Sequence, residues 1–444
     1  MLVHVKKGRV WLKDVKEYRG KFIEVFIKNK NTQTSFIAVI PKDGRFYIPI
    51  KIRKYLEIDN DINIRKIVIL KNKARSINLI ENNKFNIISI IPNKTLSNYK
   101  IVIKELKNKY LCWYCTQGRP KEILLNKYVS LSFIKLLGYY QAEGGKPKLR
   151  KRNGRNFDFT NKRFDLIKDF FELSSYILDK KEWKATICYN KDIDYKIITD
   201  LKIRLNNLVI DSSHIFIKSA ERIKEYIIKI WISNSILAET IDNFNKKIKD
   251  LIFKTKNENL FKLYYQGYLA GDGNFFAYRD KNGSLHSRTY LLEEKEEYIK
   301  LHKKILDIHG FNGKIKKAKD KNLYKLILTN NWNMLIKLLE YDLFFNIPHH
   351  KEKLIWTIRN HNKFRSLKYF INLPNKFDFY ALTTITNREG NYCYNWLRKR
   401  RKDNLIERVD KGIWKLTNDG IKIRNVLNKL NSSELNPYSF QSIP

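Results

Sequence analysis

Two segments of this chain repeat each other at a fixed spacing. Residues 130–145 read SLSFIKLLGYYQAEGG, and residues 259–274 read NLFKLYYQGYLAGDGN. Each segment predicts a helix, because a capping residue precedes an apolar body and glycine follows it. The spacing of 129 residues persists at Tyr195-Lys196 and Tyr324-Lys325. One spacing that holds over such a length indicates a duplicated unit.

Both predicted helices carry small residues four positions apart, which places them on one helix face. These residues are Gly138, Ala142, Gly267 and Gly271. Small residues let two helices approach closely, so we predict that the two helices pack against each other. The packing would bring Glu143 and Asp272 side by side at helix C-termini, where the helix dipole and mutual repulsion disfavour negative charge. A divalent cation such as Mg²⁺ would hold both acids ionised. The alternative is a pair of core helices whose terminal acids only face solvent.

Basic residues far outnumber acidic ones. The 444 residues include 88 Lys and Arg against 45 Asp and Glu, which gives a formal net charge of +43 at pH 7. Such an excess destabilises a compact state through self-repulsion, and a polyanionic partner would offset it. Nucleic acid is therefore the first expected partner, and an anionic lipid surface is the alternative.

Hydropathy and cysteine usage exclude other classes. No apolar run approaches the ~20 residues of a membrane span, and the N-terminus lacks an apolar stretch of signal-peptide length. We therefore expect no membrane segment and a cytoplasmic location. Four cysteines give no disulfide framework. Cys112 and Cys115 form a single C-x-x-C pair, whereas a structural zinc site usually needs two, so we expect ordinary packing.

Residues 136–144 (LLGYYQAEG) and 265–273 (YQGYLAGDG) resemble the two motifs of a LAGLIDADG homing endonuclease of the double-motif, monomeric type. The resemblance covers residues 125–365. It implies an α+β fold with two pseudo-symmetric αββαββα repeats, at about 125–250 and 251–365, whose sheets form a basic saddle over DNA. It also implies that Glu143 and Asp272 are catalytic acids, and that they bind divalent metal together with the adjoining Ala142 and Gly271.

The two motifs depart mildly from the family pattern: Gln141 and Ala270 replace the usual first acid, and Tyr265-Gln266 begins the second motif. In this family, basic residues near the metals polarise water and stabilise the transition state. Lys196 and Lys325 occupy equivalent positions of the duplication, on segments that we expect to be strands, and we predict this role for both. A lysine at a strand edge can also serve solubility alone.

A basic hairpin is expected after each motif, with Asn153-Gly154 and Asn282-Gly283 as turn signals. Such hairpins could enter the major groove, where arginine bidentate to guanine is the commonest specific contact. The candidate DNA contacts are Arg150, Arg152, Arg155, Arg279 and Arg288. The alternative for each is a phosphate contact or a solvated charge.

The N-terminal flank, residues 1–92, predicts a β-rich domain, and residues 93–124 predict a basic connector. Residues 39–58 resemble the swapped-hairpin domain of AbrB-type DNA-binding proteins, through Gly44-Arg45, Ile48-Pro49, Arg53 and Leu56. The resemblance implies DNA contacts by Arg45 and Arg53, and a hairpin that could dimerise by interlocking. The alternative is a generic β-hairpin.

The C-terminal flank, residues 374–432, resembles a winged helix. Residues 381–386 and 391–402 would form its helix-turn-helix pair, and residues 405–409 and 413–416 its wing, before a helix capped by Thr417. The predicted DNA contacts are Arg398, Lys399, Arg400 and Arg401. The alternative is an amphipathic structural cap, and residues 433–444 predict a frayed tail.

Taken together, these features predict a site-specific endonuclease for double-stranded DNA, in which each acid serves the cleavage of one strand with Mg²⁺ or another divalent ion. The duplicated core should act as a monomer. Two alternatives use the same scaffold: an RNA-binding maturase that assists intron splicing, and a DNA-binding regulator that does not cut. The presence of both acids disfavours the regulator, and the two flanking segments favour DNA over intron RNA.

Overall fold

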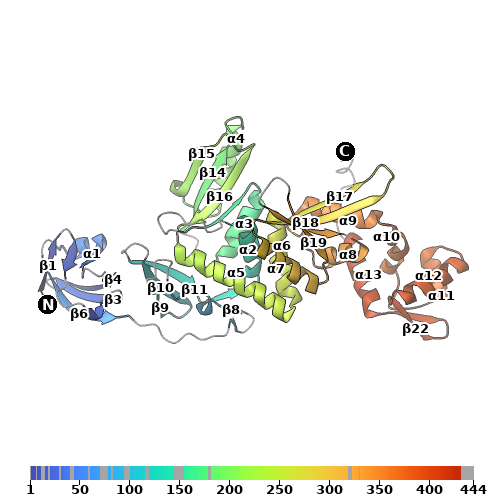
Figure 1. Cartoon of the computed structure of the whole chain (residues 1–444), viewed down its shortest axis with the longest axis horizontal. Helices are drawn as coiled ribbons and strands as arrows, with labels where there is room; N and C mark the ends of the chain where they lie inside the picture. The colour runs from blue at the N-terminus through green and yellow to red at the C-terminus, as the bar shows by residue number, and fades with distance from the viewer. Residues whose placement is uncertain are drawn as a thin grey trace. The chain divides into compact units, whose positions relative to one another are not determined.

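The fold is mixed α+β in a computed structural model of the whole chain (Figure 1). The structure describes all residues except 1, 7, 12–15, 19–20, 30–31, 41–44, 59–60, 71–78, 82–83, 95–100, 116–119, 145–154, 179–181, 319–322, 330 and 432–444. The chain divides into two compact units, Met1–Asp250 and Leu251–Pro444, which are described separately below.

The first unit begins with a six-stranded sheet in the order β4-β3-β6-β1-β2-β5. Its strands are β1 (Leu2–Lys6), β2 (Arg9–Trp11), β3 (Phe22–Asn29), β4 (Thr32–Val39), β5 (Arg45–Tyr47) and β6 (Asp61–Ile69). A 3₁₀ turn, η1 (Lys16–Tyr18), follows β2, and a short helix, α1 (Ile50–Tyr55), follows β5. Alternate residues such as Val10, Val25 and Phe46 fill one core, as the period of two along a strand requires.

Two small antiparallel sheets follow. The first contains β9 (Val102–Glu105), β10 (Lys109–Cys115) and β11 (Pro120–Asn126), and the second contains β7 (Ile80–Glu81), β8 (Lys84–Asn86) and β12 (Tyr128–Ser130). Within the segment 93–124, which we expected to be a connector, the described residues therefore include the strands β9 and β10 and the start of β11. Cys112 and Cys115 are buried on β10. Within the described residues, no group of three or more His, Cys, Asp or Glu side chains is placed to hold a metal ion.

The rest of the first unit packs helices on a four-stranded sheet. Its elements are α2 (Phe133–Glu143), β13 (Phe157–Asn161), α3 (Phe164–Ser174), β14 (Lys184–Tyr189), α4 (Tyr195–Asn207), a short 3₁₀ turn η4 (Ser212–His214), β15 (Ile215–Ser219), β16 (Tyr226–Ile232) and α5 (Ser235–Thr255). The sheet order is β13-β16-β14-β15, and β14 with β15 is its parallel pair. A parallel pair needs a crossover, which α4 supplies. Helices α2 and α3 pack on β13.

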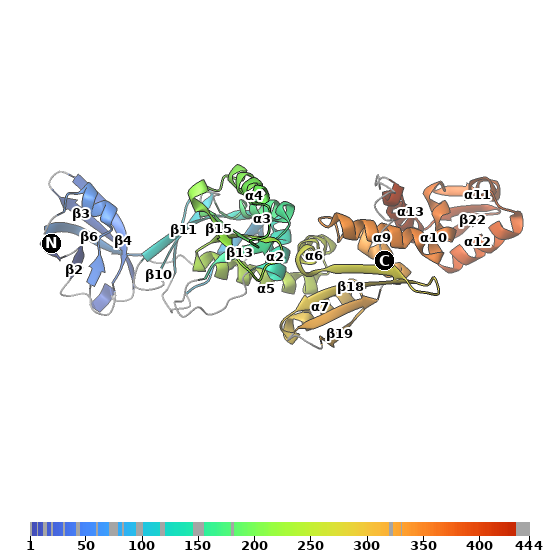
Figure 2. The same ribbon diagram turned by 90° about the horizontal axis from the view of Figure 1, so that it is seen from above.

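The second unit begins with the element order αββαββα. These elements are α6 (Glu258–Asp272), β17 (Asn274–Arg279), β18 (Leu285–Glu293), α7 (Glu296–Ile308), β19 (Gly313–Lys317), β20 (Tyr324–Thr329) and α8 (Trp332–Glu340). The antiparallel sheet has the order β17-β18-β20-β19, and α7 packs on its last three strands (Figure 2). Aromatic rings of α6, including Phe261, Tyr265 and Tyr268, form the core beneath it.

The chain then continues through short helices into a last three-stranded sheet with the order β21-β23-β22. The elements are α9 (Pro348–Asn360), α10 (Asn362–Leu367), η5 (Lys368–Ile371), β21 (Lys376–Asp378), α11 (Phe379–Thr386), α12 (Gly390–Lys402), β22 (Ile406–Asp410), β23 (Ile413–Leu416) and α13 (Asn418–Asn431). Thr417 precedes α13 and accepts a hydrogen bond from the Gly420 amide at 3.2 Å. None of the helices in the described part of the chain is long and apolar enough to cross a bilayer.

Candidate functional site

The two predicted acids occupy the same place on their helices. Glu143 is the last residue of α2, and Asp272 is the last residue of α6. Both side chains are half-buried. Gly144 and Gly273 follow as C-cap residues, and the backbone leaves each helix directly into extended structure. Each acid is therefore the last helical residue before extended backbone.

The glycine after each acid is required by a close approach of the backbone. The amide of Gly144 donates to the Tyr140 carbonyl at 3.0 Å, and that of Gly273 donates to the Leu269 carbonyl at 3.0 Å. A Cβ atom on Gly144 or Gly273 would lie only 2.3 or 2.5 Å from the same carbonyl oxygen. Ordinary contacts begin near 3.4 Å, so no larger residue fits without a shift of the backbone.

Buried tyrosines anchor both motif helices. In the first unit, the Tyr139 hydroxyl donates to Asp169 on α3 at 2.6 Å. In the second, Tyr268 donates to the Leu292 carbonyl at 2.8 Å, and the hydroxyl of Tyr265 lies 3.0 Å from Nδ1 of His302. Burial raises the pKa of Tyr265 and Tyr268 well above the ordinary value. Both hydroxyls therefore stay protonated, and that of Tyr268 continues to donate to the Leu292 carbonyl.

The position where the family usually has its first acid holds a different residue in each motif helix. Gln141 accepts hydrogen bonds from Asn245 at 3.0 Å and from Lys249 at 3.1 Å, both on α5. In the second unit the corresponding Ala270 is buried at 8 % exposure. Each helix end therefore offers one carboxylate, because the neighbouring position is an amide in one case and apolar in the other.

The small residues of the motif helices lie in the expected environment. Gly138, Ala142 and Gly267 are buried, and Gly271 is half-buried. Their packing between the two helices stays a prediction.

The donors at each helix end suit a hard divalent cation. The last carbonyls of a helix, which include those of Ala142 and Gly271, have no intrahelical partner. Together with one carboxylate they provide oxygen ligands, which Mg²⁺ prefers. One carboxylate and a carbonyl do not complete its coordination, so water and substrate phosphate would have to supply the rest.

One face of each four-stranded sheet is open and carries basic and aromatic side chains. In the second unit, Phe276 pairs with Arg288, and Lys325 pairs with both Leu292 and Lys316. Arg288 and Lys316 are exposed, as is Phe276 at 47 %. The opposite face buries Thr289, Leu291, Leu326 and Leu328 against the helices. Arg288 is therefore well placed for a contact across this face.

The open face in the first unit also carries basic and aromatic side chains, but these are half-buried, and the face includes the buried Asp158, which pairs with Trp231. Lys184, Thr186, Lys229 and Trp231 lie on it, because Lys184 pairs with Trp231 and Thr186 pairs with Lys229. The ammonium of Lys184 lies 5.3 Å from the centre of the Trp231 ring. The intervening positions, such as Ile230, are buried.

The structure corrects the predicted equivalence of Lys196 and Lys325. Lys325 lies on β20 as expected, but Lys196 is the second residue of helix α4 rather than part of a strand. The element pair α4-β15 has no counterpart in the second unit, so the spacing of 129 residues no longer relates equivalent positions beyond it.

Strand register identifies Lys229 as the counterpart of Lys325. Lys229 on β16 pairs with Thr160 of β13, and Lys325 on β20 pairs with Leu292 of β18. Thr160 follows Asp158 by two residues, and Leu292 follows Tyr290 by two residues. The ammonium of Lys229 forms an ion pair with Asp158, and that of Lys325 lies 4.1 Å from the Tyr290 ring centre. The sequence pattern that could have revealed this equivalence is a single lysine beside alternating buried apolar residues, in residues 228–232 and 324–328.

Two of the arginines proposed for the hairpins are engaged within the fold. Arg155 forms an ion pair with Asp242 of α5, and its side chain is only 12 % exposed. Arg279 donates to the Gly283 carbonyl at 2.8 Å and to Asn360 Oδ1 of α9 at 3.1 Å. The contacts of Arg279 hold the end of the β17–β18 hairpin. Arg150 and Arg152 lie outside the described residues.

The C-terminal helix α12 divides its basic residues between two faces. Arg398, Lys399 and Arg401 are exposed. Arg400 is only 3 % exposed and pairs with Asp403 at 3.0 Å, so it is poorly placed for the predicted DNA contact. The reason is helical periodicity: Arg400 follows the buried Trp396 by four residues and lies on the same face.

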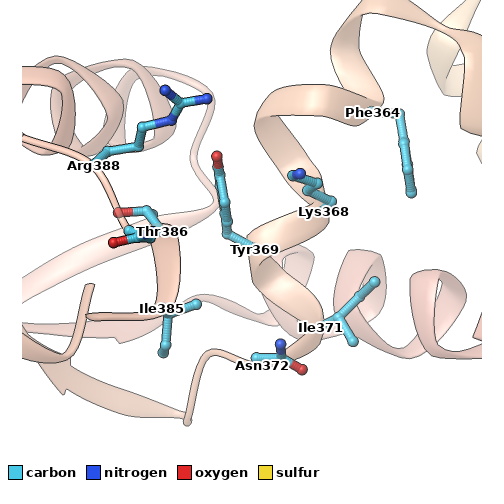
Figure 3. A pocket seen from close by; sticks show the side chains of 9 residues that line it. Phe364, Lys368, Tyr369, Ile371, Asn372, Ile385, Thr386 and Arg388 are labelled. Carbon is cyan, nitrogen blue, oxygen red and sulfur yellow. The ribbon is translucent and has the colours of Figure 1, made fainter. Parts of the chain in front are cut away.

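A hollow of about 630 Å³ lies beside the turn between α11 and α12. Figure 3 shows Arg388 and Thr386 on one wall, and Tyr369 and Lys368 on the other. Lys368 and Arg388 are exposed, so the hollow is positively charged and open. No sequence pattern indicates this hollow, because its walls lie on separate elements.

In the N-terminal sheet, the two predicted arginines differ. Arg45 is exposed, with its guanidinium 4.7 Å from the centre of the Trp11 ring. Arg53 is half-buried and packs over Gly8, where an added Cβ would meet its Cζ atom at 2.6 Å. Arg45 is thus the better placed of the two for a partner.

Comparison with known proteins gives structural neighbours only. No protein-family profile matches the chain, and no curated protein matches it. Mesophilic variants of the homing endonuclease I-DmoI align at 17 % identity over 47 % of this chain and 88 % of theirs, with a TM-score of 0.30. The I-LtrWI LAGLIDADG homing endonuclease, bound to target DNA, aligns at 12 % identity over 52 % and 99 %, with a TM-score of 0.27. Full-length DUF199/WhiA from Thermatoga maritima aligns at 15 % identity over 68 % and 91 %, with a TM-score of 0.28.

Proposed function

We propose that this protein is a site-specific endonuclease that hydrolyses double-stranded DNA with divalent metal ions at Glu143 and Asp272. The observation that carries the proposal is the shared construction of the two helix ends. In each, an acid is the last helical residue, and it is followed by a glycine that cannot be replaced without a backbone shift. A solvent-facing terminal acid would not need so constrained a junction twice.

The surroundings of the acids support a nucleic-acid substrate. Lys184, Lys229, Arg288 and Lys316 lie on the open faces of the two sheets, among exposed or half-exposed aromatic rings. Phosphate contacts supply most of the affinity in such interfaces, and the net charge of +43 favours them. The two sheets would form the proposed basic saddle.

In the proposed mechanism, each acid serves one strand of the duplex. Glu143 and Asp272 would hold the ions, with the carbonyl oxygens of Ala142 and Gly271 as neighbouring donors. A bound Mg²⁺ would supply an activated water and charge stabilisation for the displaced oxygen. Lys229 and Lys325 would direct positive charge toward the phosphate in the transition state.

The proposal is tested by selecting cleaved sequences from a randomised duplex library with Mg²⁺, and then comparing variants on the selected site. Glu143→Gln or Asp272→Asn should leave one strand uncut, so that the products are nicked, and the double variant should cut neither strand. Glu221→Gln is a matched control, because its side chain is 87 % exposed. Cutting by the double variant at the rate of the unmodified protein would refute the assignment. Duplex binding without cutting by the unmodified protein would indicate a regulator, and a preference for intron RNA would indicate a maturase.

A further inference from the structure

The N-terminal sheet contains a second internal repeat. Residues 6–11 read KKGRVW, and residues 42–47 read KDGRFY, at a spacing of 36 residues. Arg9 thus corresponds to Arg45, and Trp11 corresponds to Tyr47. Each copy lies in the same series of elements: β1, β2, η1 and β3 in the first half, and β4, β5, α1 and β6 in the second.

The strand pairing interlocks the two halves. Strand β1 pairs with β6, β3 pairs with β4 and β6, and β2 pairs with β5, so each of these pairs joins one half to the other. The register of β2 with β5 matches Arg9 to Tyr47, Val10 to Phe46 and Trp11 to Arg45. When each residue is replaced by its equivalent 36 positions away, the pair Arg9–Tyr47 becomes the pair Arg45–Trp11, so the register is symmetric. Two halves of one chain therefore interlock here, whereas the resemblance implied a hairpin that could interlock with a second copy.

The same register builds two equivalent basic sites on the outer face. Val10 and Phe46 point into the core at 0 % and 2 % exposure, whereas Arg9, Trp11, Arg45 and Tyr47 are exposed. The guanidinium of Arg45 lies 4.7 Å from the Trp11 ring centre, and that of Arg9 lies 5.0 Å from the Tyr47 ring centre. Arg9 Nε also donates to the Tyr47 hydroxyl. Each ring orients the guanidinium stacked on it.

We propose that residues 1–69 form a single-chain unit with local two-fold symmetry, and that its β2–β5 face binds the two phosphate backbones of duplex DNA through Arg9 and Arg45. The two strands of a duplex are themselves related by two-fold axes, so a two-fold pair of arginines meets equivalent groups on both. Arginine suits this role because its planar guanidinium both stacks on an aromatic ring and binds phosphate. Lys6, which pairs with Arg9 in the sheet, adds positive charge to the same face.

The inference rests on the proposed function only in taking duplex DNA as the partner, and it does not depend on cleavage. The test therefore uses the full chain without metal, a fluorescent duplex and a range of salt concentrations. Arg9→Ala and Arg45→Ala should each lower the slope of log affinity against log salt by about 1, which makes the affinity loss between 50 and 200 mM salt about 3–4 times smaller per variant. The double variant should show both effects. Arg65→Ala is the matched control, since Arg65 is exposed on β6 of the same sheet.

Arg9→Lys and Arg45→Lys distinguish a loss of charge from a disturbed fold as the cause of weaker binding. Both variants keep the positive charge and should therefore keep the salt slope. The unmodified chain should sediment as a monomer. Three results would overturn the inference: effects of Arg9→Ala and Arg45→Ala no larger than that of Arg65→Ala, an effect of only one of the two, or a dimer formed through this sheet. A failure of cleavage at Glu143 and Asp272 would leave the measurement unaffected, so the two proposals fail separately.

Discussion

Replacement of Gly273 by alanine tests the account of the acidic helix ends. The new Cβ would lie 2.5 Å from the Leu269 carbonyl oxygen and 2.6 Å from its Cα, whereas ordinary contact begins near 3.4 Å. The separation must therefore increase by about 0.9 Å. Both Leu269 atoms belong to the backbone, so no side-chain rotation relieves the clash, and the end of α6 or the start of β17 must move.

The expected cost is about 1–3 kcal/mol, the range for inserting a methyl group into a packed site. In urea, with a slope of about 1–3 kcal/mol/M, a loss of about 2 kcal/mol lowers the midpoint by about 1 M. Hydrogen exchange followed by mass spectrometry should show the loss of protection in peptides from α6 and β17. Cleavage should fall as well, by up to about 100-fold, because Asp272 lies on the displaced helix end.

Gly390→Ala is the control within the same unit. Its new Cβ would lie 3.7 Å from the Phe379 ring, which is ordinary contact, at the first residue of α12. Alanine is favoured over glycine in a helix by about 0.5–1 kcal/mol, so the midpoint should stay or rise. Equal midpoints for Gly273→Ala and Gly390→Ala would refute the argument from close backbone approach.

Three further predictions follow from the structure. Lys229→Met should slow the cutting of one strand by about 100-fold in a strand-resolved assay, whereas Lys196→Met should not; the opposite result would restore the uniform spacing. Burial lowers the pKa of His309 below its ordinary value of 6.5, so the folded chain keeps this ring neutral while the unfolded chain takes up a proton as the pH falls through 6.5. The unfolding free energy should therefore decrease below that pH, and His309→Gln should weaken this dependence in urea titrations at pH 7.5 and 5.5. Arg400→Ala should lower stability by about 1–2 kcal/mol through lost packing and pairing, whereas Arg398→Ala should leave thermal unfolding unchanged and weaken DNA binding.

The elements that the sequence predicted well are those with local signals. The motif helices end at Glu143 and Asp272 as expected, because an apolar run, an acid and a glycine together specify a helix terminus. In the C-terminal flank, α11, α12, β22 and β23 begin and end within two residues of the predicted ranges. There the turn at residues 410–412 and the Thr417 cap are also local.

The places where the structure differs from the sequence-based expectations depended on partners distant in the sequence. Arg400 was expected to contact DNA, but its burial beside Trp396 follows from packing against the rest of the domain. Lys196 was expected on a strand, but α4 and β15 extend the sheet at that point. Residues 93–124 were expected to be a connector of uncertain structure, and β10 within this segment pairs with β9 and β11 in a three-stranded sheet.

The sequence by itself determined where two helices end in an acid followed by glycine, and how strongly the chain should attract a polyanion. These properties depend on neighbours along the chain and on composition. The tertiary structure alone decided that Lys229 is the counterpart of Lys325, that Arg155 and Arg279 hold the fold, and that the N-terminal repeat interlocks with itself. Strand pairing and charge pairing join residues tens of positions apart, and many partners fit an alternating pattern equally well. Only packing in three dimensions selects among them.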